Sequence, residues 1–368
     1  MKKVFIIAGE PSGDLHASNL VKCLKEKDPY IDFRGWGGDL MLKAGVDIKN
    51  DLSKLAFMGF AEVLFNLRTI FENFNLCKKQ LREYQPDVII MVDYPGFNLR
   101  MAKWAKKNGF VVTYYVSPQI WAWKSSRIKT IKANIDRMYC ILPFEEEFYA
   151  QYGFYVHYMG HPLMDEISFH KSKEGGVKFK KGKPIIAILP GSRGQEIKRK
   201  LDVMLKAAES YKNMDIYVAA APNLDRRFFK SFQDDFPEVQ FVFGQTYDLL
   251  QESELAIVTS GTATLETALF RVPQVVCYKS SFVSYAIARF LVNIKFISLV
   301  NLIMDREIVK ELIQNNCTVD EIKIEIDLIL NDKNYRNKML SEYDELVLRI
   351  GEKGCSEKIA QDLISHYK

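Results

Sequence analysis

Two short glycine-containing segments in the second half of the chain have the composition of anion-binding loops. The first, LPGSRG, ends at Gly194 and contains Gly191, Ser192 and Arg193. Glycine lets the main chain approach a ligand, and the planar guanidinium of arginine matches phosphate oxygens. Taken alone, the segment is also compatible with a tight turn that carries a surface arginine. We expect Arg193 to be the leading phosphate ligand.

The second segment, TSGTATLE, opens a predicted helix at Gly261. The free N–H groups of a first helical turn, together with the helix dipole, attract anions. Glu266 is placed to accept ribose hydroxyls, or else only to interact with the helix dipole. Two such loops together predict a site for a diphosphate. The residues that we expect to contact the ligand here are Ser260, Gly261, Thr262, Ala263, Thr264 and Glu266.

Other phosphate and metal motifs are missing from the sequence. It contains no G-x-x-x-x-G-K-[ST] and no D-x-D pair, and Gly35-Trp36-Gly37 is followed by Leu40 where a dinucleotide fingerprint needs glycine. We therefore expect no metal and no cofactor. The charge of a departing nucleoside diphosphate would then be stabilised by main-chain N–H groups, helix dipoles and arginine.

Transfer of a sugar also needs a base to deprotonate the acceptor hydroxyl. Asp93, directly after the apolar run VIIMV, is the best-placed carboxylate, although an aspartate in D-Y-P-G can serve only the turn. Glu10 and Asp14 compete with it from the segment AGEPSGD, while His16 is expected to be a structural donor. These residues predict a nucleotide-sugar-dependent glycosyltransferase.

The elements that must position these loops alternate between short β-branched runs and longer amphipathic segments, which is typical of β-α-β units with a parallel sheet. We expect an α/β fold of two Rossmann-like, doubly wound domains facing across a cleft. The expected domains are residues 1–165 and 184–345, with a polar, lysine-rich linker at 166–183 and a helix at 346–368 that packs back on the first domain. The predicted strands are 4–8, 31–36, 88–92, 111–116, 137–142, 156–159, 185–189, 215–220, 240–243, 255–259 and 274–278. After about Asp305 the spacing of apolar residues predicts helix to the end, including DREIVKELIQ.

Composition and charge exclude several classes of function. The 368 residues are 48% hydrophobic and 26% charged, and the net charge of +5 is spread along the chain, which argues against nucleic acid as a partner. No apolar stretch reaches the roughly 18 residues that cross a bilayer. We expect a cytoplasmic protein.

Apolar side chains are nevertheless numerous in two segments. Residues 55–76 carry Phe57, Met58, Phe60, Phe65, Phe71 and Phe74 around more than one helical face, and residues 281–296 are apolar with Arg289 and Lys295 at their edges. A buried helix would explain the first segment, but attachment to a membrane surface explains its width better. The basic residues Lys124, Arg127, Lys129 and Lys132 would then meet anionic head groups.

The chain resembles the lipid-A-disaccharide synthases, metal-independent glycosyltransferases with two Rossmann-like domains (the GT-B architecture). The resemblance covers residues 4 to about 315 and rests on AGEPSGD, FMGFAEVL, PDVIIMVDYPGFN, YYVSPQIWAWKSSRIKTI, LPFEEEFY, GHPL, LPGSRGQEI, SGTATLE and SLVNLIMDREIVKELIQ. The final helices carry no diagnostic residues.

The resemblance implies an inverting transfer of 2,3-diacylglucosamine from its UDP conjugate to the 6-hydroxyl of 2,3-diacylglucosamine 1-phosphate, which gives the β-1,6-linked disaccharide and UDP. It also implies peripheral association with the inner membrane of a Gram-negative bacterium, and a homodimer stays open. Asp93 matches the proposed base, whereas Gly96 stands where many members have a second acid. Asn301 matches a polar ligand position, or caps a helix, with Glu307 and Gln314 on the helix after it. Trp121 and Trp123 line the acceptor pocket or pack the domain.

Two rival interpretations remain. A UDP-N-acetylglucosamine 2-epimerase shares the architecture and the diphosphate site but acts on a small soluble substrate, so it would not need exposed aromatic residues. A non-catalytic module that binds lipid or nucleotide sugar would not depend on Asp93.

Overall fold

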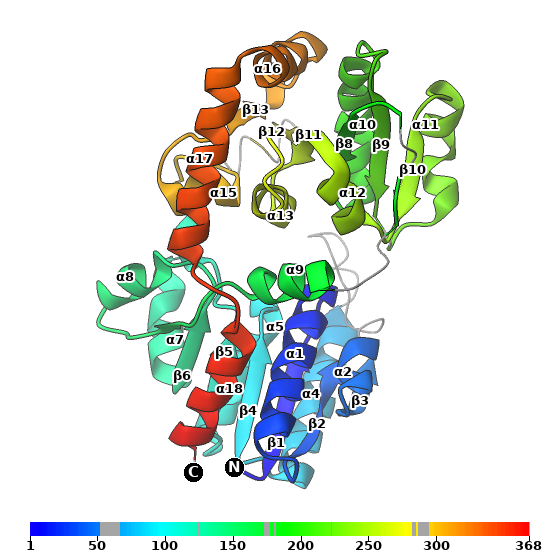
Figure 1. Cartoon of the computed structure of the whole chain (residues 1–368). Helices are drawn as coiled ribbons and strands as arrows, with labels where there is room; N and C mark the ends of the chain where they lie inside the picture. The colour runs from blue at the N-terminus through cyan, green and yellow to red at the C-terminus, as the bar shows by residue number, and fades with distance from the viewer. Residues whose placement is uncertain are drawn as a thin grey trace. The chain divides into compact units, whose positions relative to one another are not determined.

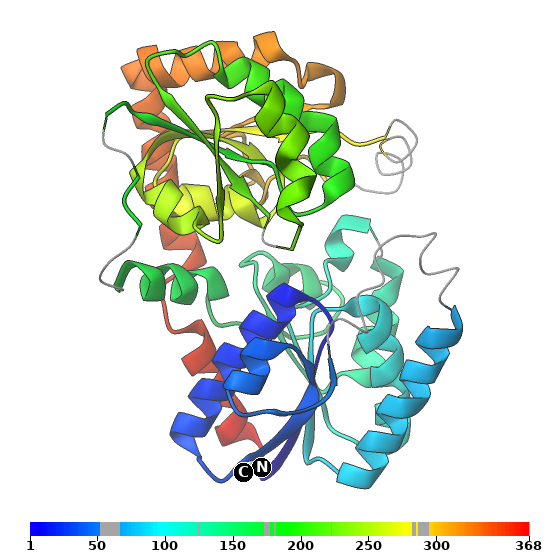
Figure 2. The same cartoon turned by 90° about the vertical axis from the view of Figure 1, so that its right-hand side faces the viewer.

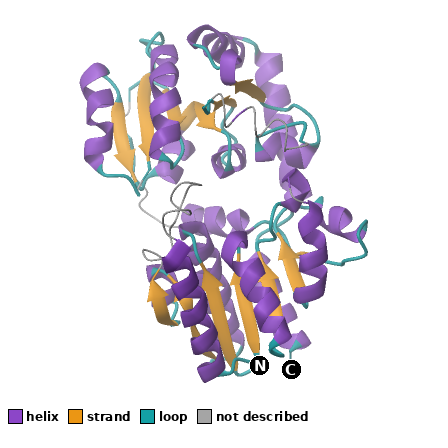
Figure 3. Cartoon of the chain, turned by 180° about the vertical axis from the view of Figure 1, so that it is seen from behind, coloured by secondary structure: helices purple, strands orange, loops and turns teal. Residues whose placement is uncertain are grey.

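The computed structural model describes residues 1–51, 67–123, 125–172, 177–179, 182–221, 223–281, 285 and 294–367. The chain forms two compact units. Unit 1 consists of Met1–Asp165 together with Glu352–Lys368, and unit 2 of Glu166–Gly351. In each unit helices flank a parallel sheet (Figures 1 and 3). The predicted α/β class is therefore confirmed.

Unit 1 contains a seven-stranded sheet in the order β3-β2-β1-β4-β5-β6-β7. Apart from the exposed Lys3, the residues of the central strands β1 and β4 are buried and apolar, as expected for a parallel sheet covered on both faces. The strands are β1 (Lys3–Ala8), β2 (Asp32–Gly37), β3 (Asp47–Asp51), β4 (Val88–Val92), β5 (Val112–Tyr115), β6 (Arg137–Cys140) and β7 (His157–Tyr158). The polar strand β3, at the edge of the sheet, was not predicted.

Two apolar cores lie on the two faces of this sheet. One is built around α4 and α5, and the other around α1 and the C-terminal helix α18. The helices of unit 1 are α1 (Pro11–Lys27), α2 (Asp39–Lys43), α4 (Leu67–Tyr84), α5 (Pro95–Lys107), α6 (Ile120–Trp123), α7 (Ile128–Asn134), α8 (Glu145–Ala150), α9 (Pro162–Ser172, which continues into unit 2) and α18 (Cys355–His366), with a short 3-10 helix η2 at Ser125–Arg127.

The C-terminal helix α18 belongs to unit 1 although it follows unit 2 in sequence. The carboxylate of Asp165 accepts hydrogen bonds from the main-chain N–H groups of Gly354 (2.5 Å) and Ser356 (3.0 Å) at its start. The N-terminal amino group of Met1 donates to the carbonyl of Tyr367 at 2.9 Å. The two chain ends thus lie side by side, as Figure 2 shows.

Unit 2 repeats the same winding with six strands in the order β10-β9-β8-β11-β12-β13. Its strands are β8 (Ile185–Leu189), β9 (Asp215–Ala220), β10 (Gln240–Phe243), β11 (Ser253–Thr259), β12 (Gln274–Tyr278) and β13 (Lys310–Ile313). Its helices are α10 (Gly194–Ala208), α11 (Lys230–Asp235), α12 (Thr246–Glu252), α13 (Thr262–Leu269), α15 (Leu299–Met304), α16 (Val319–Asn331) and α17 (Lys333–Ile350), with 3-10 turns η3 (Arg226–Phe229) and η4 (Gln314–Asn316).

The prediction of continuous helix after Asp305 is wrong for one segment. Lys310–Ile313 forms β13, which pairs in parallel with β12 and buries Leu312. The segment Lys310–Ile313 has two polar residues followed by two apolar ones and does not alternate, so pairing at the sheet edge, and not the local pattern, makes it a strand. Glu307 and Gln314, expected on a helix, flank this strand instead. The stretch 166–183, expected to be a linker, begins inside α9.

Both sheets reverse strand order at their centre. In unit 1 the reversal lies between β1 and β4, and in unit 2 between β8 and β11. Ligands of open parallel sheets bind beyond the carboxyl ends of the strands at this point. The segments there are the loops that begin at Gly9 and Asp93 in unit 1, and those that contain Gly191 and Gly261 in unit 2.

Candidate active site

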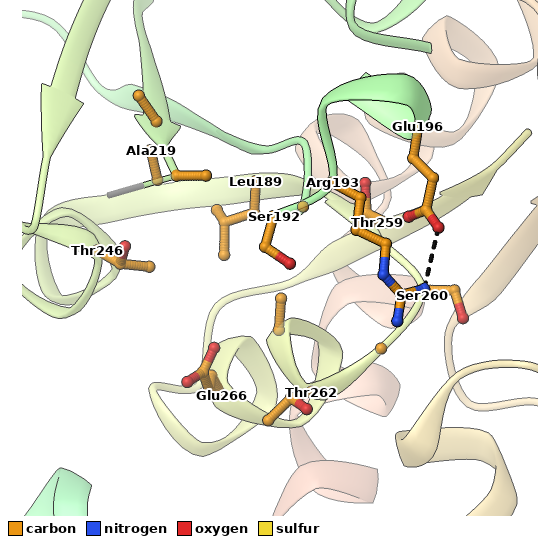
Figure 4. Close-up of a pocket in the computed structure, with 15 residues that line it drawn as sticks. Leu189, Ser192, Arg193, Glu196, Ala219, Thr246, Thr259, Ser260, Thr262 and Glu266 are labelled. Carbon is orange, nitrogen blue, oxygen red and sulfur yellow. Dashed lines mark hydrogen bonds and ion pairs between the residues drawn. The ribbon is translucent and has the colours of Figure 1, made fainter. Parts of the chain in front are cut away.

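The two glycine loops of unit 2 line one cavity of about 430 Å³, a volume within the usual range for small-molecule sites. Figure 4 shows Ser192 and Arg193 entering from the loop between β8 and α10, with Thr262 and Glu266 on α13 opposite them. Eight predicted residues line this cavity: Gly191, Ser192, Arg193, Ser260, Gly261, Thr262, Ala263 and Glu266.

Glycine is required at two positions of this wall. Gly191 has φ +94°, and a Cβ there would lie 3.3 Å from Cγ2 of Thr259. Gly261, the N-cap of α13, has φ +139°. L-amino acids with side chains rarely adopt these conformations. The loops therefore present main chain, and the first turns of α10 and α13, to the cavity.

Arg193 carries the positive charge of the cavity on an exposed side chain. Its guanidinium is 3.2 Å from Oε1 of Glu196, one turn further along α10. Oε2 of Glu196 lies 4.0 Å from Nζ of the buried Lys200, and burial lowers the pKa of that lysine. Glu196 thus holds Arg193 at the rim of the cavity, where it remains available to an anion.

Glu266 faces the cavity from α13 and accepts a hydrogen bond from the Tyr247 hydroxyl at 2.9 Å. Burial raises the pKa of this carboxyl. A carboxylate that is partly buried and already anchored on one side is suited to accept hydroxyl groups of a sugar on the other. Tyr247 was not predicted, because it meets Glu266 only through the packing of α12 against β11, the strand that leads into α13.

Three predicted ligand positions of unit 2 do not line the cavity. Gly194 starts α10. The N–H and the hydroxyl of Thr264 both donate to the carbonyl of Gly261, at 3.1 and 2.8 Å, so neither is directed at a ligand. Asn301 is fully buried within α15.

The amide of Asn301 makes only internal hydrogen bonds. Its Oδ1 accepts from the N–H groups of Ile308 (2.8 Å) and Val309 (3.1 Å), and its Nδ2 donates to Val309 O and to Glu311 Oε1, both at 2.9 Å. The same Glu311 oxygen accepts from the Ser298 hydroxyl at 2.7 Å. We assign Asn301 to holding the turn before β13 rather than to contacting a ligand.

Of the three candidate carboxylates in unit 1, Asp14 has a structural role, whereas Glu10 and Asp93 remain candidates for catalysis. Asp14 is buried, and its oxygens accept main-chain N–H groups of Gly38 (2.8 Å), Leu40 (3.1 Å) and Met41 (3.1 Å) at the start of α2. This cap occupies both oxygens, so we no longer count Asp14 as a candidate base. Glu10 and Asp93 follow the adjacent strands β1 and β4.

Asp93 has the electrostatic character of a base. Burial, and next the nearby charge of Glu10, raise the pKa of Asp93 from 3.8 to about 6. A base is most effective when its pKa lies close to the working pH, because it is then ionised yet still basic. His16, by contrast, is buried, and burial lowers its pKa to about 4, so it is neutral at physiological pH.

A buried carboxyl that the sequence analysis missed lies in LPFEEEFY. Glu145 accepts hydrogen bonds from Ser117 Oγ (2.7 Å), Trp121 Nε1 (3.2 Å) and the N–H of Leu142 (3.0 Å), and burial raises its pKa to about 7. The Trp121 ring also packs edge-on against Phe144. These contacts favour packing over an acceptor pocket for Trp121.

Several sequence predictions lie outside the described residues. They include Phe57, Met58, Phe60, Phe65, Lys124, Arg289 and the side chain of Trp123. In the part of the chain that the structure does describe, no helix is long and apolar enough to cross a membrane, and no group of histidine, cysteine, aspartate and glutamate has the geometry of a metal site.

Solved structures with this fold perform two kinds of chemistry. A UDP-GlcNAc 2-epimerase from Neisseria meningitidis, solved with UDP-GlcNAc bound, superposes with a TM-score of 0.63 at 14% identity, covering 99% of this chain and 100% of that one. The glycosyltransferase of kitacinnamycin superposes with a TM-score of 0.68 at 12% identity, covering 100% and 99%. The chain thus has the GT-B fold, which by itself does not separate an epimerase from a glycosyltransferase.

Comparison of sequences distinguishes the epimerase from the glycosyltransferase. The family model for lipid-A-disaccharide synthetase matches residues 4–363. A lipid-A-disaccharide synthase from Syntrophus aciditrophicus is 40% identical over 98% of this chain and 96% of its own length. The chain belongs to the lipid-A-disaccharide synthase family, and its activity is that of a glycosyltransferase of lipid A biosynthesis.

Proposed function

We propose that the chain transfers 2,3-diacylglucosamine from its UDP conjugate to the 6-hydroxyl of 2,3-diacylglucosamine 1-phosphate, with inversion, to give the β-1,6-linked disaccharide 1-phosphate and UDP. The observation that carries this proposal is the presence in one chain of two sites, one in each unit. One is a cavity lined by glycine loops at two helix N-termini, and the other is a carboxylate whose pKa lies near 6. Family membership supplies the substrates.

The donor site acts on the leaving group. The diphosphate of UDP lies against the main chain at Gly191 and Gly261, with Arg193 paired to its oxygens and Glu266 on the ribose. As the bond between the anomeric carbon and the phosphate oxygen breaks, its electron pair leaves with UDP. The helix dipoles and Arg193 stabilise the growing negative charge.

Asp93 acts on the acceptor. Its carboxylate removes the proton from the 6-hydroxyl while that oxygen forms the new bond to the anomeric carbon, so the protonated Asp93 and UDP are the remaining products. Glu10, whose charge contributes to the raised pKa of Asp93, supports the base and does not replace it. A single displacement of this kind inverts the α-linked donor to a β product.

We propose further that unit 1 binds the inner-membrane surface from which both acyl substrates come. The described part of the segment 55–76 supports this, because α4 exposes 65% of Phe71 and 39% of Leu76. Phe74 does not contribute, since it stacks on Phe97 at 4.4 Å. A homodimer remains a prediction.

The transfer reaction is tested with detergent-solubilised protein and the two diacyl substrates in the presence of a metal chelator. We expect disaccharide and UDP to form without added metal. A strict requirement for magnesium would contradict the proposed stabilisation of the leaving group. Incubation with UDP-N-acetylglucosamine tests the epimerase alternative, and formation of the manno epimer would overturn the proposal.

Asp93→Ala separates catalysis from binding. We expect UDP to bind as tightly as in the wild type while turnover falls by about 10²- to 10⁴-fold, the usual contribution of a general base. A variant with normal turnover would show that the reaction does not depend on Asp93 and would overturn its assignment as the base.

A further inference from the structure

The main chain at the base has an unusual conformation. Asp93 has φ +47° and the next residue, Tyr94, has φ +51°. Side-chain-bearing residues rarely adopt this left-handed region, and they persist there only where surrounding contacts determine the conformation. Two such residues in succession require specific support.

Buried side chains from two other elements hold the Asp93 carbonyl. It accepts hydrogen bonds from Nδ2 of Asn98 on α5 at 2.7 Å and from the hydroxyl of Tyr114 on β5 at 2.5 Å. Both donor residues are fully buried. The Asn98 amide also reaches the carbonyls of Val92 (3.3 Å) and Ile7 (3.5 Å), which ties the turn to the ends of β4 and β1.

The second left-handed residue connects the turn to the loop that carries Glu10. The Tyr94 ring lies directly over Gly9, where an added Cβ would come within 2.3 Å of a ring carbon. The same ring stacks on Phe97 with centroids 5.7 Å apart. Asp93 and Glu10 are therefore held by one connected set of contacts.

We infer that Asn98 and Tyr114 are positioning residues for the proposed base. They bind the main chain of Asp93, keep it in the left-handed conformation and so keep its carboxylate partly buried beside Glu10. The inference rests on the proposed function of Asp93, and neither residue is assigned a contact with substrate.

A purely stabilising role for Asn98 and Tyr114 would not change the pH dependence of the reaction, whereas a positioning role would. If the turn relaxes, the Asp93 carboxylate gains water, and its pKa falls from about 6 toward the ordinary value of 3.8. The ionisable groups around it are Glu10 from the first loop, the adjacent Tyr94, and Tyr114, whose hydroxyl is also influenced by Arg127. The acid limb of the kcat/KM profile, which reports ionisation in the free enzyme, therefore reports the position of the carboxylate.

Tyr114→Phe removes one hydroxyl and keeps the ring that fills the core. We expect kcat to fall by about ten- to a hundredfold, the cost of a misplaced catalytic group, with KM for the UDP-sugar unchanged. We also expect the acid limb to move down by about one pH unit. Asn98→Asp, which turns the donor toward three carbonyls into an acceptor, is expected to lower kcat further.

Tyr84→Phe is the matched control. The Tyr84 hydroxyl also donates to a main-chain carbonyl of unit 1, that of Asp32 at 2.8 Å, but at the amino end of the sheet. We expect its removal to leave kcat and the acid limb unchanged, whatever it does to the melting temperature.

Three results separate the positioning inference from the proposed function. If Asp93→Ala is inactive and Tyr114→Phe has the wild-type kcat and acid limb, the positioning inference is wrong and the base stands. Equal changes in Tyr114→Phe and Tyr84→Phe would also overturn it, because the effect would then not depend on Asp93. If Asp93→Ala retains turnover, the proposed base itself fails.

Discussion

The loops at both strand-order reversals contain residues with positive φ, but the residue types differ between the two units. In unit 2 the left-handed positions are occupied by glycine, Gly191 at φ +94° and Gly261 at φ +139°. In unit 1 they are occupied by Asp93 and Tyr94, at φ +47° and +51°. Glycine adopts such angles at almost no steric cost, whereas aspartate and tyrosine do so only under constraint.

The difference follows from what each loop presents. In the proposed function, N–H groups and helix dipoles bind the diphosphate at Gly191 and Gly261, so these two positions need only main chain, and a Cβ there would occupy space beside the ligand. The proposed base must remove a proton with its side chain, so the turn after β4 cannot use glycine at that position. It accepts a strained conformation instead, and Asn98 and Tyr114 stabilise it.

The largest expected effect is the addition of a side chain to the main-chain site. Gly191→Val places a β-branched residue at φ +94° with its Cβ 3.3 Å from Thr259. We expect UDP to bind about a hundredfold more weakly, which corresponds to about 3 kcal/mol. Titration calorimetry with UDP measures this. The matched control is Gly182→Val, because Gly182 has no positive φ and no neighbouring atom within 4 Å. Equal affinities of the two variants for UDP would contradict the proposal that the main chain at Gly191 binds the diphosphate.

A smaller effect is expected when the charge at the strained turn is removed. Because the folded-state pKa of Asp93 is raised to about 6 from 3.8, its ionisation destabilises the fold above pH 6, and this penalty disappears as the pH falls to about 4. We therefore expect Asp93→Asn to be inactive yet more stable than the wild type at pH 7, by on the order of 1–3 kcal/mol. Denaturant titrations should show the advantage vanishing near pH 4. A difference that does not depend on pH would contradict the burial of this carboxylate.

The smallest effect concerns Gly96, in the first turn of α5. A Cβ at this position would meet no atom within 4 Å, and an acid in a first turn interacts favourably with the helix dipole. We expect Gly96→Asp to raise the free energy of unfolding by about 0.3–1 kcal/mol, measured by denaturant titration at pH 7. Gly96→Asn controls for the change in side-chain size. A clear loss of stability in the aspartate variant alone would mean that its charge is repelled by Asp93 and Glu10.

The sequence predicted the central strands and the loops at their ends, because buried parallel strands are continuous apolar runs and the loops carry distinctive residues. It failed at the sheet edges, where β3 is polar and β13 also fits a helical spacing. Pairing with a neighbour decides such segments, and neighbours are not visible in a local pattern.

The sequence predicted the loops that line the candidate site, but not the side chains that hold the neighbouring main chain in place. Asp14 and Asn301 are polar residues near reactive loops, and only the tertiary structure shows that their oxygens and nitrogens are already used by the main chain. Tyr114 and Asn98 lie 21 and 5 residues from Asp93 in sequence. Both side chains donate to the main-chain carbonyl of Asp93, and every residue has such a carbonyl, so residue types alone do not identify the acceptor.

Because α18 contributes to the core of unit 1, that unit cannot complete its packing during synthesis until α18 has been made. Residues of unit 2 form one continuous stretch, so this unit can fold as soon as about Gly351 has left the ribosome. Unit 1 is translated first, but its core includes Cys355, Ile359, Ala360 and Leu363. Unit 1 therefore completes its core only when α18, which is synthesised after unit 2, is available, and until then α1 covers this face of the sheet without α18.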